Sequence, residues 1–164
     1  MRMHRAVLVA LSITSCHRGA ERPSAGEAPR DQFAGVQARG EVAMGVNQYT
    51  SRHVFEPLPD GGRIELERIA PDSAGTEQIR RHMQLIAARF AAGDFALPGF
   101  VHARDVPGTA VMSSRRSEIH YVVETLPRGA ALRLRSADDT AVRAIHEFLA
   151  FQRQEHHAGS HRDS

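Results

Sequence analysis

The chain contains no lysine and no tryptophan, and Cys16 is its only cysteine. Without lysine, the protein cannot form a Schiff base through a side-chain amine, nor hold a phosphate with the lysine of a phosphate-binding loop. With one cysteine, no disulfide can form within the chain. The sequence also lacks a nucleophile elbow, a dinucleotide-binding glycine pattern, a paired-cysteine zinc site and a zinc-protease histidine pair. These absences disfavour the enzyme classes that such motifs identify.

The first sixteen residues have the three zones of a secretion signal: a basic start, an apolar stretch and a short polar end. The apolar stretch is roughly ten residues long, about half of what a membrane-spanning helix needs. Ile13-Thr14-Ser15-Cys16 resembles the bacterial lipobox, in which the cysteine is acylated. We therefore expect residues 1–15 to be a lipoprotein signal peptide and Cys16 to be the lipidation site that anchors the mature protein to a membrane. The alternative is an ordinary signal peptide with an unrelated cysteine.

The residue after Cys16 is His17 rather than an aspartate, which favours the periplasmic side of the outer membrane over the inner membrane. Because Arg2 and Arg5 lie in the signal, its removal would leave equal numbers of basic and acidic residues. A nucleic-acid partner would need a net basic surface. We therefore expect a lipid membrane as a partner, and no nucleic acid.

Composition divides the remaining chain into a predicted tether, a domain and a tail. Residues 16–43 are rich in Arg, Glu, Gly, Ala, Ser and Pro and show no apolar periodicity, which predicts a disordered tether. Residues 44–159 are the predicted domain, and residues 160–164 a disordered tail. Within the domain one pattern occurs twice, over about 51–93 and about 117–159.

Each of the two units predicts a hairpin followed by a helix. Alternating apolar and charged residues flank the turns Pro59-Asp60-Gly61-Gly62 and Leu126-Pro127-Arg128-Gly129. Apolar residues then recur at spacings of three and four; they are Ile79, Met83, Ile86 and Phe90 in the first unit and Val142, Ile145 and Leu149 in the second. Because one hairpin with one helix cannot cover its own apolar face, we expect the two units to join. The predicted fold is an α+β two-layer sandwich, with one antiparallel sheet and both helices on one face.

Local signals mark the ends of these elements. Gly93 is expected to cap the first helix, Gly159 is a candidate terminator of the second, and Ser136 with Asp139 resembles a capping box before it. The connection from Phe95 to Arg116 is predicted to be a loop, with a short extended piece around 100–103, because it contains two proline and glycine pairs.

Several histidines fall at positions that should face the interior. His53 lies on the core face of its strand, His82 borders the first helical stripe, and His102 and Met112 lie in the connection. Imidazoles with a thioether would suit copper, and imidazoles alone would suit zinc or nickel. Structural histidines and core-filling methionines are the alternative. Secondary candidates are His120 and His146, whereas the terminal histidines are expected to be solvated; these are His156, His157 and His161.

Several short motifs carry a resemblance to a known family. They are Met44-Gly45-Val46-Asn47-Gln48, His53 before Phe55, Asp60-Gly61-Gly62, Ile79-Arg80 with His82, Phe90 to Phe95, Val101-His102-Ala103, Pro107-Gly108 with Met112, and Ile145 to Leu149. Over about 44–159 the chain resembles a family of small uncharacterised bacterial proteins, some of which are labelled aspartate carbamoyltransferase. The chain has neither the length nor the carbamoyl-phosphate loop of that enzyme. The family pattern has two further histidines where this chain has Val54 and Leu85, so a metal held through such pairs would have lost two donors here.

Three functions remain open from the sequence. The first is a non-catalytic envelope lipoprotein that binds a small ligand or a transition metal, copper or zinc, through His53, His82, His102 and Met112. The second is an envelope protein-interaction module in which the histidines are structural. The third is a hydrolase or transferase with His102 or His120 as the base, for which no nucleophile is identified.

Overall fold

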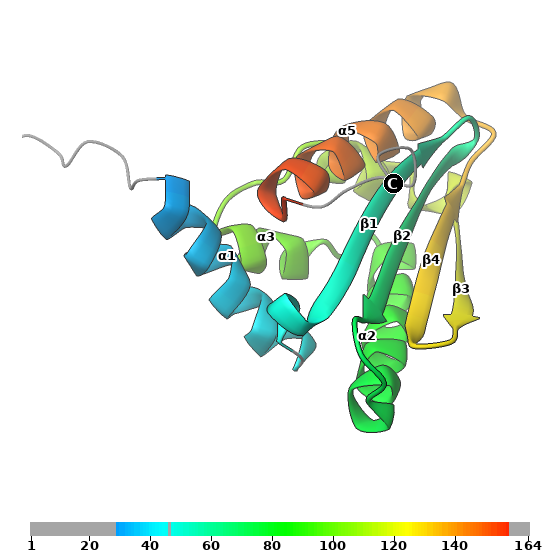
Figure 1. Cartoon of the computed structure of the whole chain (residues 1–164). Helices are drawn as coiled ribbons and strands as arrows, with labels where there is room; N and C mark the ends of the chain where they lie inside the picture. The colour runs from blue at the N-terminus through cyan, green and yellow to red at the C-terminus, as the bar shows by residue number, and fades with distance from the viewer. Residues whose placement is uncertain (1–28, 46, 158–164) are drawn as a thin grey trace, which may run out of the picture.

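A computed structural model describes residues 29–45 and 47–157 (Figure 1). The predicted signal peptide, Cys16, Gly159, His161 and the predicted tail lie outside these residues. Among the described residues, no helix is long and apolar enough to cross a membrane.

Four strands form one antiparallel sheet in the order β1-β2-β4-β3. The strands are β1 (Ser51–Leu58), β2 (Gly61–Arg68), β3 (His120–Leu126) and β4 (Gly129–Arg135). Each unit contributes one hairpin, and the two hairpins join through β2 and β4, where Ile64 lies opposite Leu132. Alternation along the strands turns Ile64, Leu66 and Leu132 into the core and leaves charged residues on the other face.

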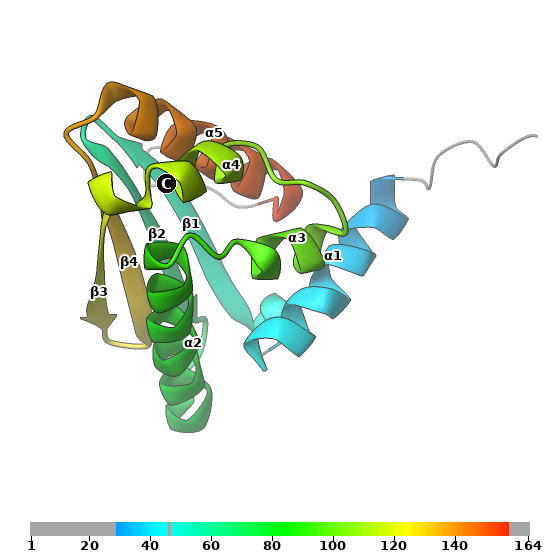
Figure 2. The ribbon, with the colours of Figure 1, turned by 180° about the vertical axis from the view of Figure 1, so that it is seen from behind.

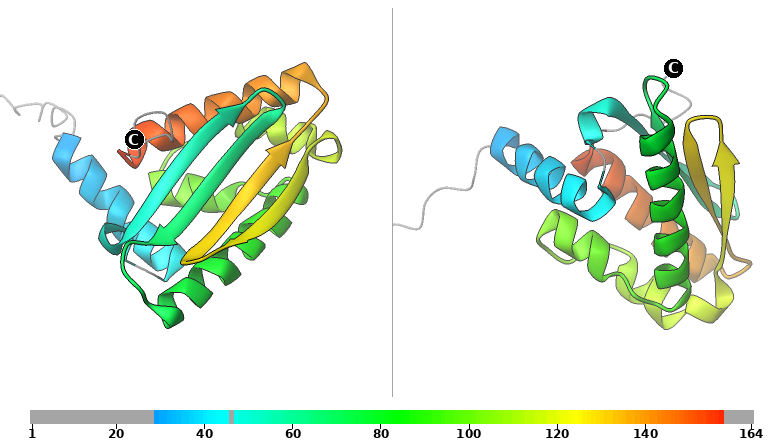
Figure 3. Two further views of the ribbon diagram at one scale, coloured as in Figure 1. Left: turned by 45° about the vertical axis from the view of Figure 1, so that its right-hand side comes forward. Right: turned by 90° about the horizontal axis from the view of Figure 1, so that it is seen from below.

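The open face of the sheet is polar. Arg63 on that face pairs with Glu65 at 2.6 Å and also with Glu124 of β3. The five α-helices of the described residues all lie on the opposite side (Figures 1 and 3), so these helices cover one face of the sheet. The predicted α+β two-layer sandwich is confirmed.

The two long helices are α2 (Ser73–Ala91) and α5 (Asp139–Glu155). Each packs mainly on the hairpin of the other unit: α2 lies against β3 and β4, and α5 against β1 and β2. Hydrogen bonds also connect α2 to the hairpin of the other unit, because Arg80 of α2 donates to the carbonyls of Leu126 and Gly129. The two units are thus interlocked rather than placed side by side (Figure 2).

The helix ends differ in part from their predicted caps. Gly93 has the expected left-handed conformation, with φ at +79°. The cap of α5 is Asp138, which accepts a hydrogen bond from the Ala141 amide at 2.7 Å, so the predicted Ser136–Asp139 box is wrong. Ser136 instead donates its hydroxyl to the Glu118 carbonyl at 2.8 Å, which ties the start of β3 to the end of β4.

The connection between the units is helical, so the predicted loop with an extended piece is wrong. It holds α3 (Ala96–His102) and α4 (Thr109–Ser114). Pro98 lies in the first turn of α3, where its missing amide costs no hydrogen bond, and Ala103 ends the helix with φ at +52°. Burial of Val101 and His102 against the other helices supplies the stability that the local sequence lacks.

The predicted disordered tether is wrong for residues 29–43, because they belong to α1 (Pro29–Met44). The helix packs against α3, with Val36, Gln37 and Gly40 buried. Arg39 donates from Nε to the Val101 carbonyl at 2.7 Å. Its apolar pattern is too weak to predict a helix, so tertiary contacts explain its formation.

Candidate functional site

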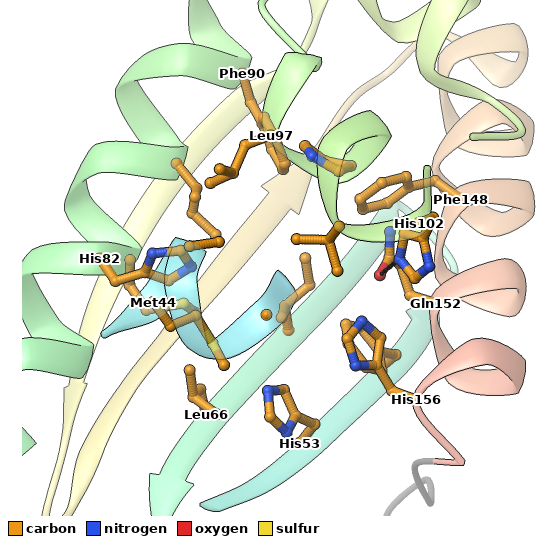
Figure 4. Close-up of a pocket in the computed structure, with 18 residues that line it drawn as sticks. Met44, His53, Leu66, His82, Phe90, Leu97, His102, Phe148, Gln152 and His156 are labelled. Atoms are coloured by element: carbon orange, nitrogen blue, oxygen red, sulfur yellow. Dashed lines mark hydrogen bonds between the residues drawn. The ribbon is translucent and has the colours of Figure 1, made fainter. Parts of the chain in front are cut away.

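A cavity of about 90 Å³ lies under the sheet, where α2 and α5 diverge toward opposite hairpins (Figure 4). Six elements supply its walls: β1 and β2 above, α2 and α5 on two sides, and α1 and α3 across the remaining opening. Most of the lining is apolar, and the polar members are four histidines and one glutamine: His53, His82, His102, His156 and Gln152. We call His53, His82, His102 and His156 the cavity histidines.

His53 projects from β1 into the cavity, opposite His82 and Met44 (Figure 4). The alternation of β1 places it on the same face as the buried Phe55, whose ring lies 6.2 Å from its own, centroid to centroid. Its Nε2 atom is buried and has no hydrogen-bond partner among the described residues. Burial, with a smaller contribution from charge on His82, lowers the pKa of His53 to about 4.

His82 projects from α2 and connects that helix to α1. It hydrogen bonds to the backbone of Ala43, near the C-terminal end of α1. Burial lowers its pKa to about 4, although this hydrogen bond acts in the opposite direction. His82 therefore has a structural partner, whereas the described residues provide none for the Nε2 atom of His53.

His102 is the last residue of α3, and its side chain is completely buried. Its Nε2 lies 3.0 Å from Gln152 Oε1 on α5, and because that oxygen only accepts, the hydrogen belongs on Nε2. Its Nδ1 lies 3.9 Å from Glu155 Oε2, and Glu155 in turn pairs with Arg104 at 2.7 Å. Burial lowers the pKa of His102 despite the opposing effects of Gln152 and Glu155.

His156 joins the site, so the expectation that it is solvated is wrong. Its ring centroid lies 5.3 Å from that of His53 and 5.2 Å from that of His102. Burial, followed by charge on His53 and His102, lowers its pKa to about 3. A signal for this position exists, since Ile145, Leu149, Gln152 and His156 continue one helical face at spacings of four, three and four.

The remaining sequence candidates do not share the cavity. Met112 is fully buried in the core but is not among the residues that line the cavity; the thioethers there are Met44 and Met83. His146 bonds to the Leu58 carbonyl at 2.9 Å and so fastens α5 to β1. His120 is exposed on β3, beside a separate polar surface depression.

The cavity histidines do not form a preorganised metal site with other common ligands. Among the described residues, no group of three or more His, Cys, Asp and Glu side chains is arranged to hold one metal ion. Of the four side chains predicted to converge, His53, His82 and His102 line the same cavity and Met112 does not.

The lining chemistry restricts what can bind. At neutral pH the cavity histidines are uncharged, because burial holds each pKa below its usual value. The described lining residues include no Arg, Lys, Asp or Glu and no hydroxyl or thiol. The site therefore suits an uncharged guest. Among the described lining residues, imidazole is the only type of side-chain nucleophile.

Comparison with known proteins adds no assignment. No protein-family model, curated protein or solved structure matches the chain. The family resemblance drawn from short motifs remains a prediction.

Proposed function

We propose that this chain is an envelope lipoprotein whose domain binds a small uncharged ligand in the cavity that the four histidines line. The observation that carries the binding proposal is an apolar cavity with four neutral imidazoles, whose described lining contains no charged residue. Small-molecule sites are typically concave and apolar, with a few polar groups that fix orientation. The envelope location and the anchor at Cys16 rest on the lipobox-like sequence and on the signal that precedes it.

Binding can be tested with thiophene, an uncharged five-membered ring. The full chain carrying Cys16→Ser is labelled on its methionine methyl groups, because Met44 and Met83 line the cavity whereas Met112 is a core reference. We expect saturable shifts of the Met44 and Met83 signals, with a dissociation constant on the order of 1 mM, about −4 kcal/mol. Absence of saturable shifts with thiophene and also with pyrazole, a ring of the same size with a polar edge, would contradict the proposal.

Two matched variants locate the binding. Val101→Phe adds volume to a residue of the cavity wall, whereas Val122→Phe makes the same change on the open face of the sheet, where Val122 is 51% exposed. We expect binding to be lost in the first variant and retained in the second, with thermal unfolding used to confirm that both are folded. Equal binding by both variants would place the guest elsewhere.

A transition metal is the other outcome that these samples can reveal. Imidazoles and thioethers suit Cu(I), and imidazoles suit Zn(II). Titration with each ion, in wild type and in His53→Phe, separates the two proposals. Saturable one-to-one binding of a metal that is lost in the variant, without binding of thiophene, would replace the small-ligand proposal.

The anchor has its own test. In cells fed a labelled fatty acid, we expect label in the wild-type protein and none in Cys16→Ala, which should also leave the membrane fraction. Label that persists in the variant would contradict lipidation at Cys16.

A further inference from the structure

The Nε2 atom of His53 is a buried polar group with no hydrogen-bond partner in the part of the chain that the structure describes. His82 bonds to the backbone of Ala43, and His102 bonds through Nε2 to Gln152. The Nδ1 atom of His102 also lacks a hydrogen bond among the described residues, but it lies 3.9 Å from the carboxylate of Glu155. A buried hydrogen-bonding atom without a partner usually costs about 1–3 kcal/mol, and natural folds leave few of them without a reason. The position of His53 therefore calls for a partner beyond the described residues.

The ring of His53 can serve such a partner only as a neutral group. Burial and the nearby His82 keep it uncharged at pH 7, so Nε2 either accepts or donates one hydrogen bond, according to the tautomer. Anions are disfavoured, because the described lining holds no cation to pair with them. A partner that carries a neutral N–H, O–H or ring nitrogen is the best match.

The remaining wall favours a small flat ring. Phe55, Phe90 and Phe148 contribute aromatic surfaces, and Met44 and Met83 contribute polarisable sulfur, which packs well against aromatic rings. The volume of about 90 Å³ is smaller than the cavity of about 150 Å³ known to hold benzene, so a five-membered ring fits better than a larger one.

We infer that the cavity recognises a small uncharged heteroaromatic ring, whose polar edge exchanges a hydrogen bond with Nε2 of His53 and whose faces pack against the phenylalanine and methionine side chains. This inference rests on the proposed function and specifies its ligand class. The competing explanation is an ordered water that satisfies Nε2 and leaves the cavity indifferent to polar edges.

The test compares pyrazole with thiophene in the full chain carrying Cys16→Ser. The two rings have the same number of ring atoms, but only pyrazole has a hydrogen-bonding edge, and it is uncharged at pH 7. Because the two compounds differ in their own hydration, the informative quantity is the ratio of their dissociation constants, compared between wild type and variants.

In His53→Phe we expect the preference for pyrazole over thiophene to fall about tenfold, the equivalent of one lost hydrogen bond of about 1.4 kcal/mol. His120→Phe, the same change at an exposed position, should leave the ratio unchanged. His53→Gln keeps an amide that can exchange a hydrogen bond and should retain part of the preference. A ratio that stays constant in His53→Phe, while both rings still bind, overturns this inference and leaves the proposed function intact. If neither ring binds the wild type, both fail.

A second measurement keeps the test decisive if His53→Phe does not fold. In protein that keeps His53 and has ¹⁵N-labelled histidine rings, pyrazole should shift the Nε2 resonance of His53 by several parts per million. Thiophene should leave this resonance in place. Equal responses to the two rings would overturn the inference.

Discussion

At the scale of single residues, two methionines differ in what they contact: one packs in the core and the other lines the cavity. Met112 is completely buried among core side chains, whereas Met44 lies on the cavity wall and is only partly buried. The sequence cannot make this distinction, because both methionines lie outside the regular helical stripes that the pattern predicts. Thioether placement therefore depends on α1 and α4, which only tertiary packing reveals.

We predict that Met112→Ala lowers the free energy of unfolding by about 2–5 kcal/mol, as expected for the loss of a buried methionine side chain. Its affinity for thiophene should stay unchanged while the protein is folded. Met44→Ala should show the reverse pattern, with a smaller loss of stability and a clear change in affinity. Denaturant unfolding and the methyl titration measure the two quantities, and a parallel response of both variants would contradict the separation.

Helices at the cavity rim show where prediction from sequence succeeds and fails at the scale of elements. The hairpins and the two long helices were predicted because strict alternation and strong apolar stripes encode them locally. The helices α1 and α3 were missed because their signals are weak: α1 is rich in small and charged residues, and α3 contains proline and glycine. Both form by packing on each other and on the core, and both supply cavity walls.

The dependence of α1 on tertiary contacts can be measured with one substitution. Val36 is 3% exposed, and Val36→Asp would bury a carboxylate without a partner, so we expect the helix to leave its place on α3. Hydrogen exchange should accelerate across residues 33–44 and remain slow in β2 and β4. Val42→Asp is the matched control, because Val42 lies on the same helix and is 77% exposed. Equal exchange in the two variants would mean that α1 holds its position without Val36.

Acid sensitivity is the consequence of the cavity histidines for the whole molecule. Burial lowers the pKa of His53 and His82 to about 4 and that of His156 to about 3, while an unfolded chain has ordinary histidines near 6.5. The unfolded state therefore binds more protons than the folded state between about pH 6.5 and pH 4. The contribution of these neutral histidines to the free energy of unfolding is fully present above about pH 6.5, and it is lost progressively as the pH falls toward about 4.

We predict that the midpoint of denaturant unfolding falls as the pH is lowered from 7 to 4.5, with uptake of up to about three protons on unfolding. His53→Phe should remove part of this dependence, and His120→Phe should not. Unfolding measured at several pH values gives the proton uptake from the slope. A slope that is the same in His53→Phe and in wild type would show that His53 does not contribute.

Because each long helix packs on the hairpin of the other unit, a substitution in one unit should affect the packing of both. Ile79 and Met83 belong to the earlier unit by sequence, yet their helix supports the sheet strands of the later one, and Ile145 and Leu149 do the converse. Neither half carries the covering that its own strands require. If the two units arose by duplication, a buried core of this kind would have formed only once both units were present. Recombination that replaced one unit alone would have to preserve its contacts with the other.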